Sequence, residues 1–115
     1  MEITLLLEFP QRQQLRDWLL ENHTSAKECW VVMSRSKNPV AVLPYLDVVE
    51  EALCFGWIDS TLKKLPDGRL AQRLSPRRKN SHWTEHNKQR CQELESRGLM
   101  TPAGKDALDN AISSQ

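Results

Sequence analysis

The sequence has 115 residues, of which 39% are hydrophobic and 27% are charged, a composition that excludes a disordered chain and fits one globular domain spanning residues 1–115. The formal net charge of +1 excludes a strong overall attraction to nucleic acid or to an anionic membrane. The apolar start, Ile3–Leu7, is too short for a signal peptide, and no run approaches the roughly 20 apolar residues of a membrane span. We therefore expect a cytoplasmic protein with no membrane insertion.

A helix and a strand are predicted in the first third of the chain. Pro10 suits the first turn of a helix that carries Leu15, Trp18 and Leu19 at helical spacing and stops near Asn22 to Thr24. The segment Cys29–Arg35 is aromatic and β-branched, which predicts a strand whose centre is buried on both faces.

A second, amphipathic helix is predicted from Pro44 to about Gly56. We expect its apolar stripe to face the core and its acidic stripe to face solvent. The apolar stripe is Leu46, Val49, Ala52 and Leu53, and the acidic stripe is Asp47, Glu50 and Glu51.

The segment from residue 57 to residue 75 predicts a β-hairpin around the loop Pro66-Asp67-Gly68. Strict alternation along the two strands places Asp59 and Arg73 on one face, where they would meet across the hairpin. The apolar face would hold Ile58, Leu62, Leu70 and Leu74, and the opposite face Trp57, Asp59, Arg73 and Ser75.

Two more helices are predicted after the hairpin. Ser81 is a good N-cap for a helix that ends at Gly98. Asn87 falls on the inward face of this helix, where its amide needs partners, and the loop 76–80 is the expected one. A final helix begins at Pro102. Together these elements predict an α+β fold, a small antiparallel sheet packed with about four helices.

The thiols and imidazoles do not point to metal or redox chemistry. Cys29, Cys54 and Cys91 are odd in number and far apart, which suits a reducing compartment and small buried apolar residues. Cys54 shares a helical face with carboxylates, which raise the pKa of a thiol and favour a structural role over a nucleophilic one. His82 and His86 have the i, i+4 spacing of two metal ligands, but no third ligand is near. We expect no metal and no cofactor.

The segment Lys63–Lys79 is the most basic part of the chain, with seven lysines and arginines against one acidic residue. Arg77 and Arg78 precede a predicted helix N-terminus, whose N–H groups and dipole favour a phosphate or carboxylate. The alternative is a solvated hairpin rim. Trp57 and Trp83 bracket the segment, either as a stacking wall for a ligand or as core residues.

Six strings of residues follow one another along most of the chain. They are Trp18-Leu19-x-x-Asn22-His23, the Trp30 strand, Ala52 to Asp59, Gln72-Arg73-x-Ser75-Pro76-Arg77, Ser81-x-Trp83-x-x-x-Asn87 and Gly98-x-Met100-Thr101-Pro102-Ala103-Gly104. On these strings the chain resembles the bacterial bacteriocin-protection family, also called the YdeI/OmpD-associated family.

The resemblance implies tolerance of bacteriocins or cationic antimicrobial peptides and an indirect link to an outer-membrane porin. It implies no established reaction, cofactor or catalytic residues. A further helical segment of many relatives, with an Ala-Lys then Thr-Arg pattern, is not found here, so a function carried by that segment is not expected. The candidate site consists of residues on the shared strings that strand parity and helix periodicity also group: Trp57, Asp59, Arg73, Arg77, Ser81, Trp83 and Asn87.

Four functions compete for this cluster. The leading hypothesis is a non-enzymatic binding domain, in which Arg73, Arg77 and a helix N-terminus hold an anionic ligand between two tryptophans. Asp59 would orient Arg73. A protein-interaction module would instead use the tryptophans and arginines as hot spots for a protein partner. Nucleic-acid binding through the basic hairpin ranks third because the domain is nearly neutral, and an enzyme with Asp59 as its acid or base ranks fourth.

Overall fold

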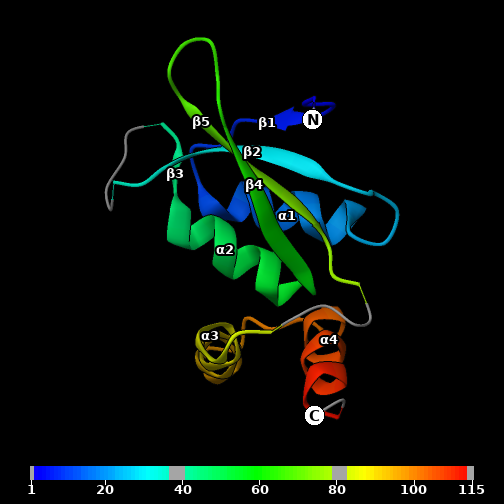
Figure 1. Cartoon of the computed structure of the whole chain (residues 1–115). Coiled ribbons are helices and arrows are strands. Elements are labelled where there is room, and N and C mark those ends of the chain that lie inside the picture. Colours follow the sequence, from blue (N-terminus) through cyan, green and yellow to red (C-terminus); the bar gives the residue numbers. More distant parts are fainter. Residues whose placement is uncertain (1, 37–40, 79–82, 114–115) are drawn as a thin grey trace.

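The computed structural model describes residues 2–36, 41–78 and 83–113. Within them, a five-stranded sheet and four helices confirm the α+β class (Figure 1). The elements are β1 (Leu6–Leu7), α1 (Arg12–Asn22), β2 (Cys29–Ser34), β3 (Leu43–Pro44), α2 (Tyr45–Cys54), β4 (Trp57–Lys64), β5 (Leu70–Pro76), α3 (Glu85–Ser96) and α4 (Pro102–Ser113).

The sheet is mixed rather than antiparallel as predicted. Its strands run in the order β1-β2-β5-β4, and both β1 and the short β3 pair with β2 in parallel. The hairpin β4–β5 and the pair β2–β5 are antiparallel. The predicted strand around Val31 is confirmed as β2, and its successive side chains from Cys29 to Val32 are fully buried, so both faces of its centre are buried.

The first helix follows the prediction except at its start, because Pro10 lies before the N-cap Gln11 and not in the first turn. Its start is held by Gln11, whose backbone N–H donates to Oε1 of Gln14 at 3.0 Å. Leu15 and Leu19 are fully buried at the helical spacing expected of a core-facing stripe. At the other end, the carbonyl oxygen of Leu19 accepts the backbone N–H of His23 at 2.8 Å, and His23 Nδ1 lies 2.7 Å from the same oxygen.

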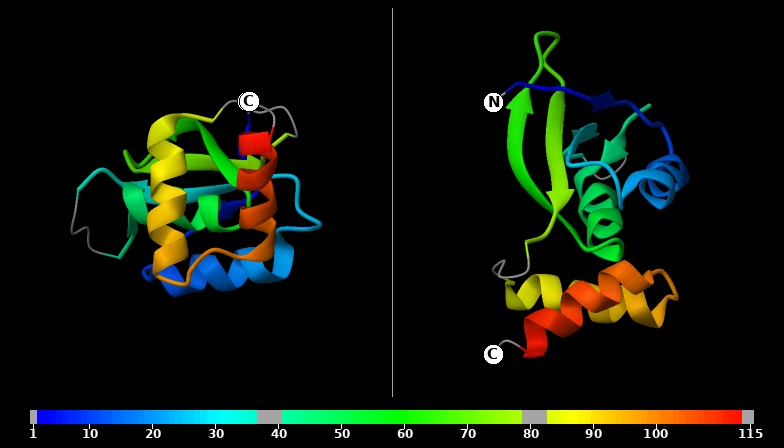
Figure 2. Two further views of the ribbon diagram at one scale, coloured as in Figure 1. Left: turned by 90° about the horizontal axis from the view of Figure 1, so that it is seen from below. Right: turned by 90° about the vertical axis from the view of Figure 1, so that its right-hand side faces the viewer.

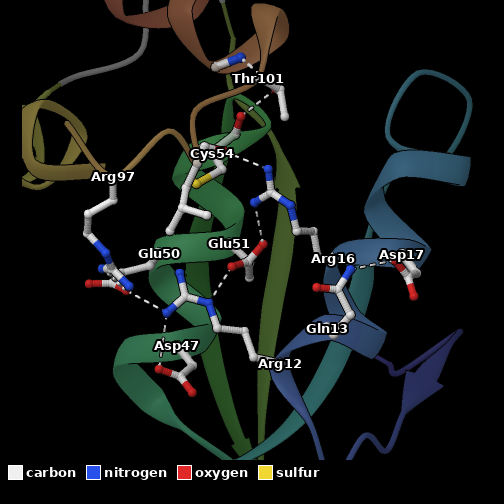
Figure 3. Close-up of polar contacts among 12 residues, drawn as sticks. Arg12, Gln13, Arg16, Asp17, Asp47, Glu50, Glu51, Cys54, Arg97 and Thr101 are labelled. Atoms are coloured by element: carbon white, nitrogen blue, oxygen red, sulfur yellow. Dashed lines mark hydrogen bonds and ion pairs between the residues drawn. The ribbon is translucent and has the colours of Figure 1, made fainter. Parts of the chain in front are cut away.

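The acidic stripe of α2 does not face solvent, and this prediction was wrong. Glu51 is 1% exposed, because α1 lies beside α2 and presents arginines to the acidic stripe (Figure 3). Arg12 Nε donates to Glu51, and Arg16 Nη1 donates to the other carboxylate oxygen of Glu51 at 3.0 Å. Leu46, predicted to be in the core, is 47% exposed. Opposite charges on two helices therefore turned the expected polar face inward.

The same ion cluster reaches beyond the helix pair. Arg12 Nη1 also lies 2.7 Å from a carboxylate oxygen of Glu50, and Arg97, just after α3, lies 3.7 Å from the same carboxylate. Arg16 Nη2 donates to the carbonyl oxygen of Leu99 at 2.7 Å. Charged groups thus connect α1 and α2 to the segment between α3 and α4.

A bulge in β4 overturns the predicted faces of the hairpin. Asp59 pairs with Leu74 and Leu62 pairs with Gln72, so three steps along β4 match two along β5. The extra residue shifts parity, which puts Asp59 and Leu62 on the core face with Leu74. Ile58 instead shares the outer face with Arg73, so Asp59 and Arg73 do not meet.

The bulge also explains why Gln72 is buried. The Nε2 of this side chain donates to the carbonyl oxygen of Thr61, inside the bulge, at 3.2 Å. A bulge takes backbone groups out of the strand ladder, and a buried amide is a suitable partner for them.

The helices α3 and α4 lie side by side across the end of the sheet and α2 (Figure 2). The helix α3 begins later than predicted, because Thr84 is its N-cap and accepts a hydrogen bond from the N–H of Asn87 at 3.1 Å. The predicted cap, Ser81, lies outside the described residues. The start of α4 at Pro102 is confirmed.

The contact between α2 and α4 is a close approach of two backbones. The N–H and the hydroxyl of Thr101 both donate to the carbonyl oxygen of Cys54. A Cβ on Gly104 would lie 2.3 Å from that oxygen, closer than any side chain allows. Gly56, at φ +73°, turns the chain from α2 into β4 in a conformation that favours glycine, and it abuts Ala103. Glycine at 104 is therefore required for α4 to dock.

Across residues 2–36, 41–78 and 83–113, no helix is both long and apolar enough to cross a membrane.

The three cysteines are buried free thiols, as predicted. Burial raises the pKa of Cys29 to about 12, and burial together with the charge of Glu51 raises the pKa of Cys54 to about 11. Burial likewise raises the pKa of Cys91 to about 11. These thiols are protonated at neutral pH, which argues against a cysteine nucleophile.

The raised thiol pKa values predict a loss of stability in alkali. The unfolded chain loses these protons near pH 9 and the folded chain only near pH 11 to 12. The stabilisation that the buried thiols contribute to the folded state is therefore complete below pH 9 and is lost progressively as the pH rises above 9. Each thiol should lower the free energy of unfolding by at most about 1.4 kcal/mol per pH unit in that window. Urea denaturation at pH 8, 9 and 10 measures this, and Cys54→Ala should show a shallower fall than the wild type. If the free energy of unfolding fell equally with pH in the wild type and in Cys54→Ala, the raised pKa of Cys54 would be contradicted.

Candidate functional site

A cleft of about 280 Å³ opens where the ends of β4 and β5 approach α4. One wall is formed by Trp57 and by residues that follow β5, with Trp83 beside them. The opposite wall is one face of α4, and the turn after α2, with Gly56, closes one end. The close packing of α4 against α2 therefore also sets the width of the cleft.

Arg77 is the central cation of the cleft. Its guanidinium carbon lies 3.8 Å from the centre of the Trp83 ring, which is a close cation–π contact. Its backbone N–H donates to the carbonyl oxygen of Gly56 at 3.0 Å, which ties the strand end to the turn after α2. Burial lowers the pKa of Arg77, and the negative charge of Asp59 offsets only part of that effect. An anion bound beside this guanidinium would favour its charged form.

The second wall is a face of α4 with small and polar side chains, of which Asp106 and Asn110 are exposed. Ala103, Asp106, Ala107 and Asn110 follow the i, i+3, i+4, i+7 spacing of one helical face, and all four line the cleft. Small side chains here leave the space in front of Arg77 unfilled. Asp106 supplies an acidic group opposite the arginines.

Three of the predicted site residues meet at this cleft: Trp57, Arg77 and Trp83. Both tryptophans belong to the hydrophobic core, with exposures of 1% and 6%. Their buried rings therefore support the wall of the cleft and leave little surface for a ligand to contact. Ser81 lies outside the described residues.

Asp59 and Arg73 have partners other than each other. The carboxylate of Asp59 accepts a hydrogen bond from the hydroxyl of Tyr45 at 2.9 Å, on the core face. On the outer face, Arg73 Nε pairs with Glu28 at 2.8 Å. The prediction that Asp59 orients Arg73 was wrong, because the β4 bulge separates them. Arg73 does not line the cleft described here.

Asn87 lies in the first turn of α3, and its expected contact with the loop 76–80 stays a prediction. Its side-chain oxygen accepts a hydrogen bond from Arg90 Nη1 at 2.9 Å, one turn along α3, and it is only partly buried. Residues 79–82, which include part of the loop that Asn87 was expected to bind, lie outside the described part of the chain.

Four cleft residues with polar or charged side chains were not among the predicted site residues: His23, Arg78, Asp106 and Asn110. His23 follows α1, so only the packing of the helices brings it to the cleft. Asp106 and Asn110 carried a signal, since they alternate with alanines at helical spacing near the end of the chain. Arg78 belongs to the basic segment already noted.

Part of the charge of the basic hairpin is neutralised. Arg69 pairs with Glu8 at 2.9 Å and with Asp67 at 2.7 Å, and Arg73 pairs with Glu28. Two acidic residues distant in the chain, Glu8 and Glu28, thus offset some of the positive charge seen in the sequence. In the described part of the chain, no group of three or more histidine, cysteine, aspartate or glutamate side chains is placed to hold a metal ion.

The fold and the cleft together define a small α+β domain with an arginine-lined cleft between its hairpin and its last helix. The chain belongs to the family described as Domain of unknown function (DUF8412), whose family model matches residues 7–107. Comparisons with curated proteins and with solved structures gave no match. The matched range includes every element that forms the cleft except the end of α4.

Proposed function

We propose that this chain is a non-enzymatic binding domain that takes an anionic group, a carboxylate or phosphate, into the cleft beside Arg77. The observation that carries the proposal is the half-buried guanidinium stacked on Trp83, whose charged form burial disfavours. Arg78 lies at the same cleft and is exposed, so it would attract the anion before Arg77 binds it. Guanidinium groups suit both anions because their donors match two oxygens at once.

Two other readings have less support. A protein-interaction surface centred on Trp57 and Trp83 would need exposed rings, whereas both are buried. Nucleic-acid binding by the hairpin would need a stripe of cations available to phosphates, whereas Arg69 and Arg73 are paired with carboxylates. A concave site lined by arginines and by polar residues of α4 favours a small ligand.

The biological role we propose follows from the family resemblance of the sequence. It is a bacterial stress-protection role in the cytoplasm, tolerance of bacteriocins or cationic antimicrobial peptides, with an indirect link to an outer-membrane porin. A domain that binds a small anionic compound would act in such a role by sensing or sequestering it.

The binding proposal predicts that inorganic phosphate stabilises the protein through the cleft. Differential scanning fluorimetry of the wild type should show a rise in Tm with phosphate at constant ionic strength. Arg78→Gln should reduce the rise without changing the Tm in the absence of phosphate, because this side chain is exposed. Lys64→Gln is the matched control, since it removes an exposed charge from β4 outside the cleft. An equal loss of the phosphate effect in both variants would contradict a cleft site.

A further inference from the structure

The cleft carries charge of both signs on facing walls. Arg77 and Arg78 lie on the wall that follows β5, and Asp106 lies on the wall formed by α4. Within residues 2–36, 41–78 and 83–113, neither Arg78 nor Asp106 takes part in an ion pair. Charged groups of both signs thus line the same cleft.

A purely anionic ligand would satisfy only half of this arrangement. It would be attracted by the arginines and repelled by the carboxylate of Asp106, a like charge within the same cleft. Removing Asp106 would then improve binding. A ligand that also carries a cationic group would place that group at Asp106 and convert the repulsion into an ion pair.

The size and lining of the cleft set further limits on the ligand. A volume of about 280 Å³ corresponds to about nine water molecules at ~30 Å³ each, room for a single amino acid or a dipeptide but not for a folded partner. Between the charged groups, the α4 wall offers the methyl groups of Ala103 and Ala107. Such a wall accepts a short aliphatic part between the two charged ends.

We infer that the ligand is a small zwitterion of the amino-acid or dipeptide class, with its carboxylate at Arg77 and Arg78 and its ammonium group at Asp106. This inference rests on the proposed function, because it concerns the ligand of the same cleft. It adds a cationic group to that ligand. It makes α4 half of the binding site.

The test uses three forms of one probe with the full chain: alanylalanine, its N-acetylated form and its C-terminal amide. Isothermal titration calorimetry should give the tightest binding for the zwitterion. Each neutralised form should bind about 10- to 100-fold more weakly, because each loses a hydrogen bond to a charged group. In Asp106→Asn the zwitterion should lose at least about tenfold in affinity while the N-acetylated form loses nothing.

Asp109→Asn is the matched control on the same helix, because Asp109 lies away from this cleft. Equal affinity of the zwitterion and the N-acetylated form, with no effect of Asp106→Asn, would overturn the zwitterion and leave the anion site standing. Failure of all three forms together with failure of phosphate to raise the Tm would overturn both the inference and the proposed function. A loss in Asp109→Asn equal to that in Asp106→Asn would also overturn the role of Asp106.

Discussion

Replacing Gly104 with alanine is expected to lower the free energy of unfolding by about 2 kcal/mol or more. A Cβ at this position would lie 2.3 Å from the carbonyl oxygen of Cys54 and 2.8 Å from that of Leu53. Both are backbone atoms, so neither can rotate away, and α4 would have to move off α2. Overpacking of this kind costs about 1–3 kcal/mol and occasionally more, which exceeds the ~1 kcal/mol that alanine gains in helix propensity. Chemical denaturation measures the net effect.

The sign of the change in the free energy of unfolding makes the test decisive. Overpacking by the new Cβ destabilises the protein, whereas the higher helix propensity of alanine stabilises it. If α4 were a loosely attached helix, Gly104→Ala would stabilise the protein by up to ~1 kcal/mol. Gly98→Ala is a useful comparison, since a Cβ there meets open space and only the positive φ of +71° opposes it. That change should cost about 1–2 kcal/mol. Stabilisation by Gly104→Ala would contradict the close packing of α2 and α4.

Replacing Glu51 with glutamine is expected to destabilise the protein by about 3 kcal/mol or more. Glutamine keeps the volume but removes the charge that Arg12 and Arg16 both contact. Two partly buried guanidinium groups then lose their shared partner, and breaking a buried pair costs about 3–5 kcal/mol. Urea denaturation of the variant at neutral pH measures the loss.

An exposed ion pair provides the control for this change. Glu85 pairs with Lys88 at 3.5 Å at the start of α3, and its side chain is 82% exposed. Glu85→Gln should therefore change the free energy of unfolding by less than about 1 kcal/mol. A similarly small effect of Glu51→Gln would mean that the ion cluster contributes little and that α1 is held to α2 by its apolar contacts alone.

The sequence predicted elements well wherever local chemistry decided them. Leu15 and Leu19 marked the buried stripe of α1, and the Pro66-Asp67-Gly68 loop marked the hairpin. Prediction from the sequence failed where residues distant in the chain decide whether a side chain is buried. Glu51 is buried because two arginines 35 and 39 positions away lie against it, and no local pattern reveals that.

The candidate site was predicted only in part, for a related reason. Trp57, Arg77 and Trp83 were assigned correctly to one region, because they bracket a single hairpin and the loop that follows it. Asp59 was assigned to the wrong face of the hairpin because of one extra residue in β4, since strand parity assumes an unbroken ladder. Arg73 is on the predicted face, opposite Leu74, but without Asp59 beside it. His23 and Asp106 come from the two ends of the chain, and only the docking of α4 brings them together.

The most direct test of the cleft is an NMR titration of the 15N-labelled protein with inorganic phosphate, read at its tryptophan indole signals. Trp57 and Trp83 line the cleft, whereas Trp30 is fully buried in β2 and does not line it, so it serves as an internal control. We expect the indole signal of Trp83 to shift most, together with the backbone amides of Arg77 and Arg78, while the Trp30 indole stays in place. Shifts confined to the hairpin amides around Lys63 and Lys64, with the Trp83 indole unmoved, would contradict an anion site in the cleft.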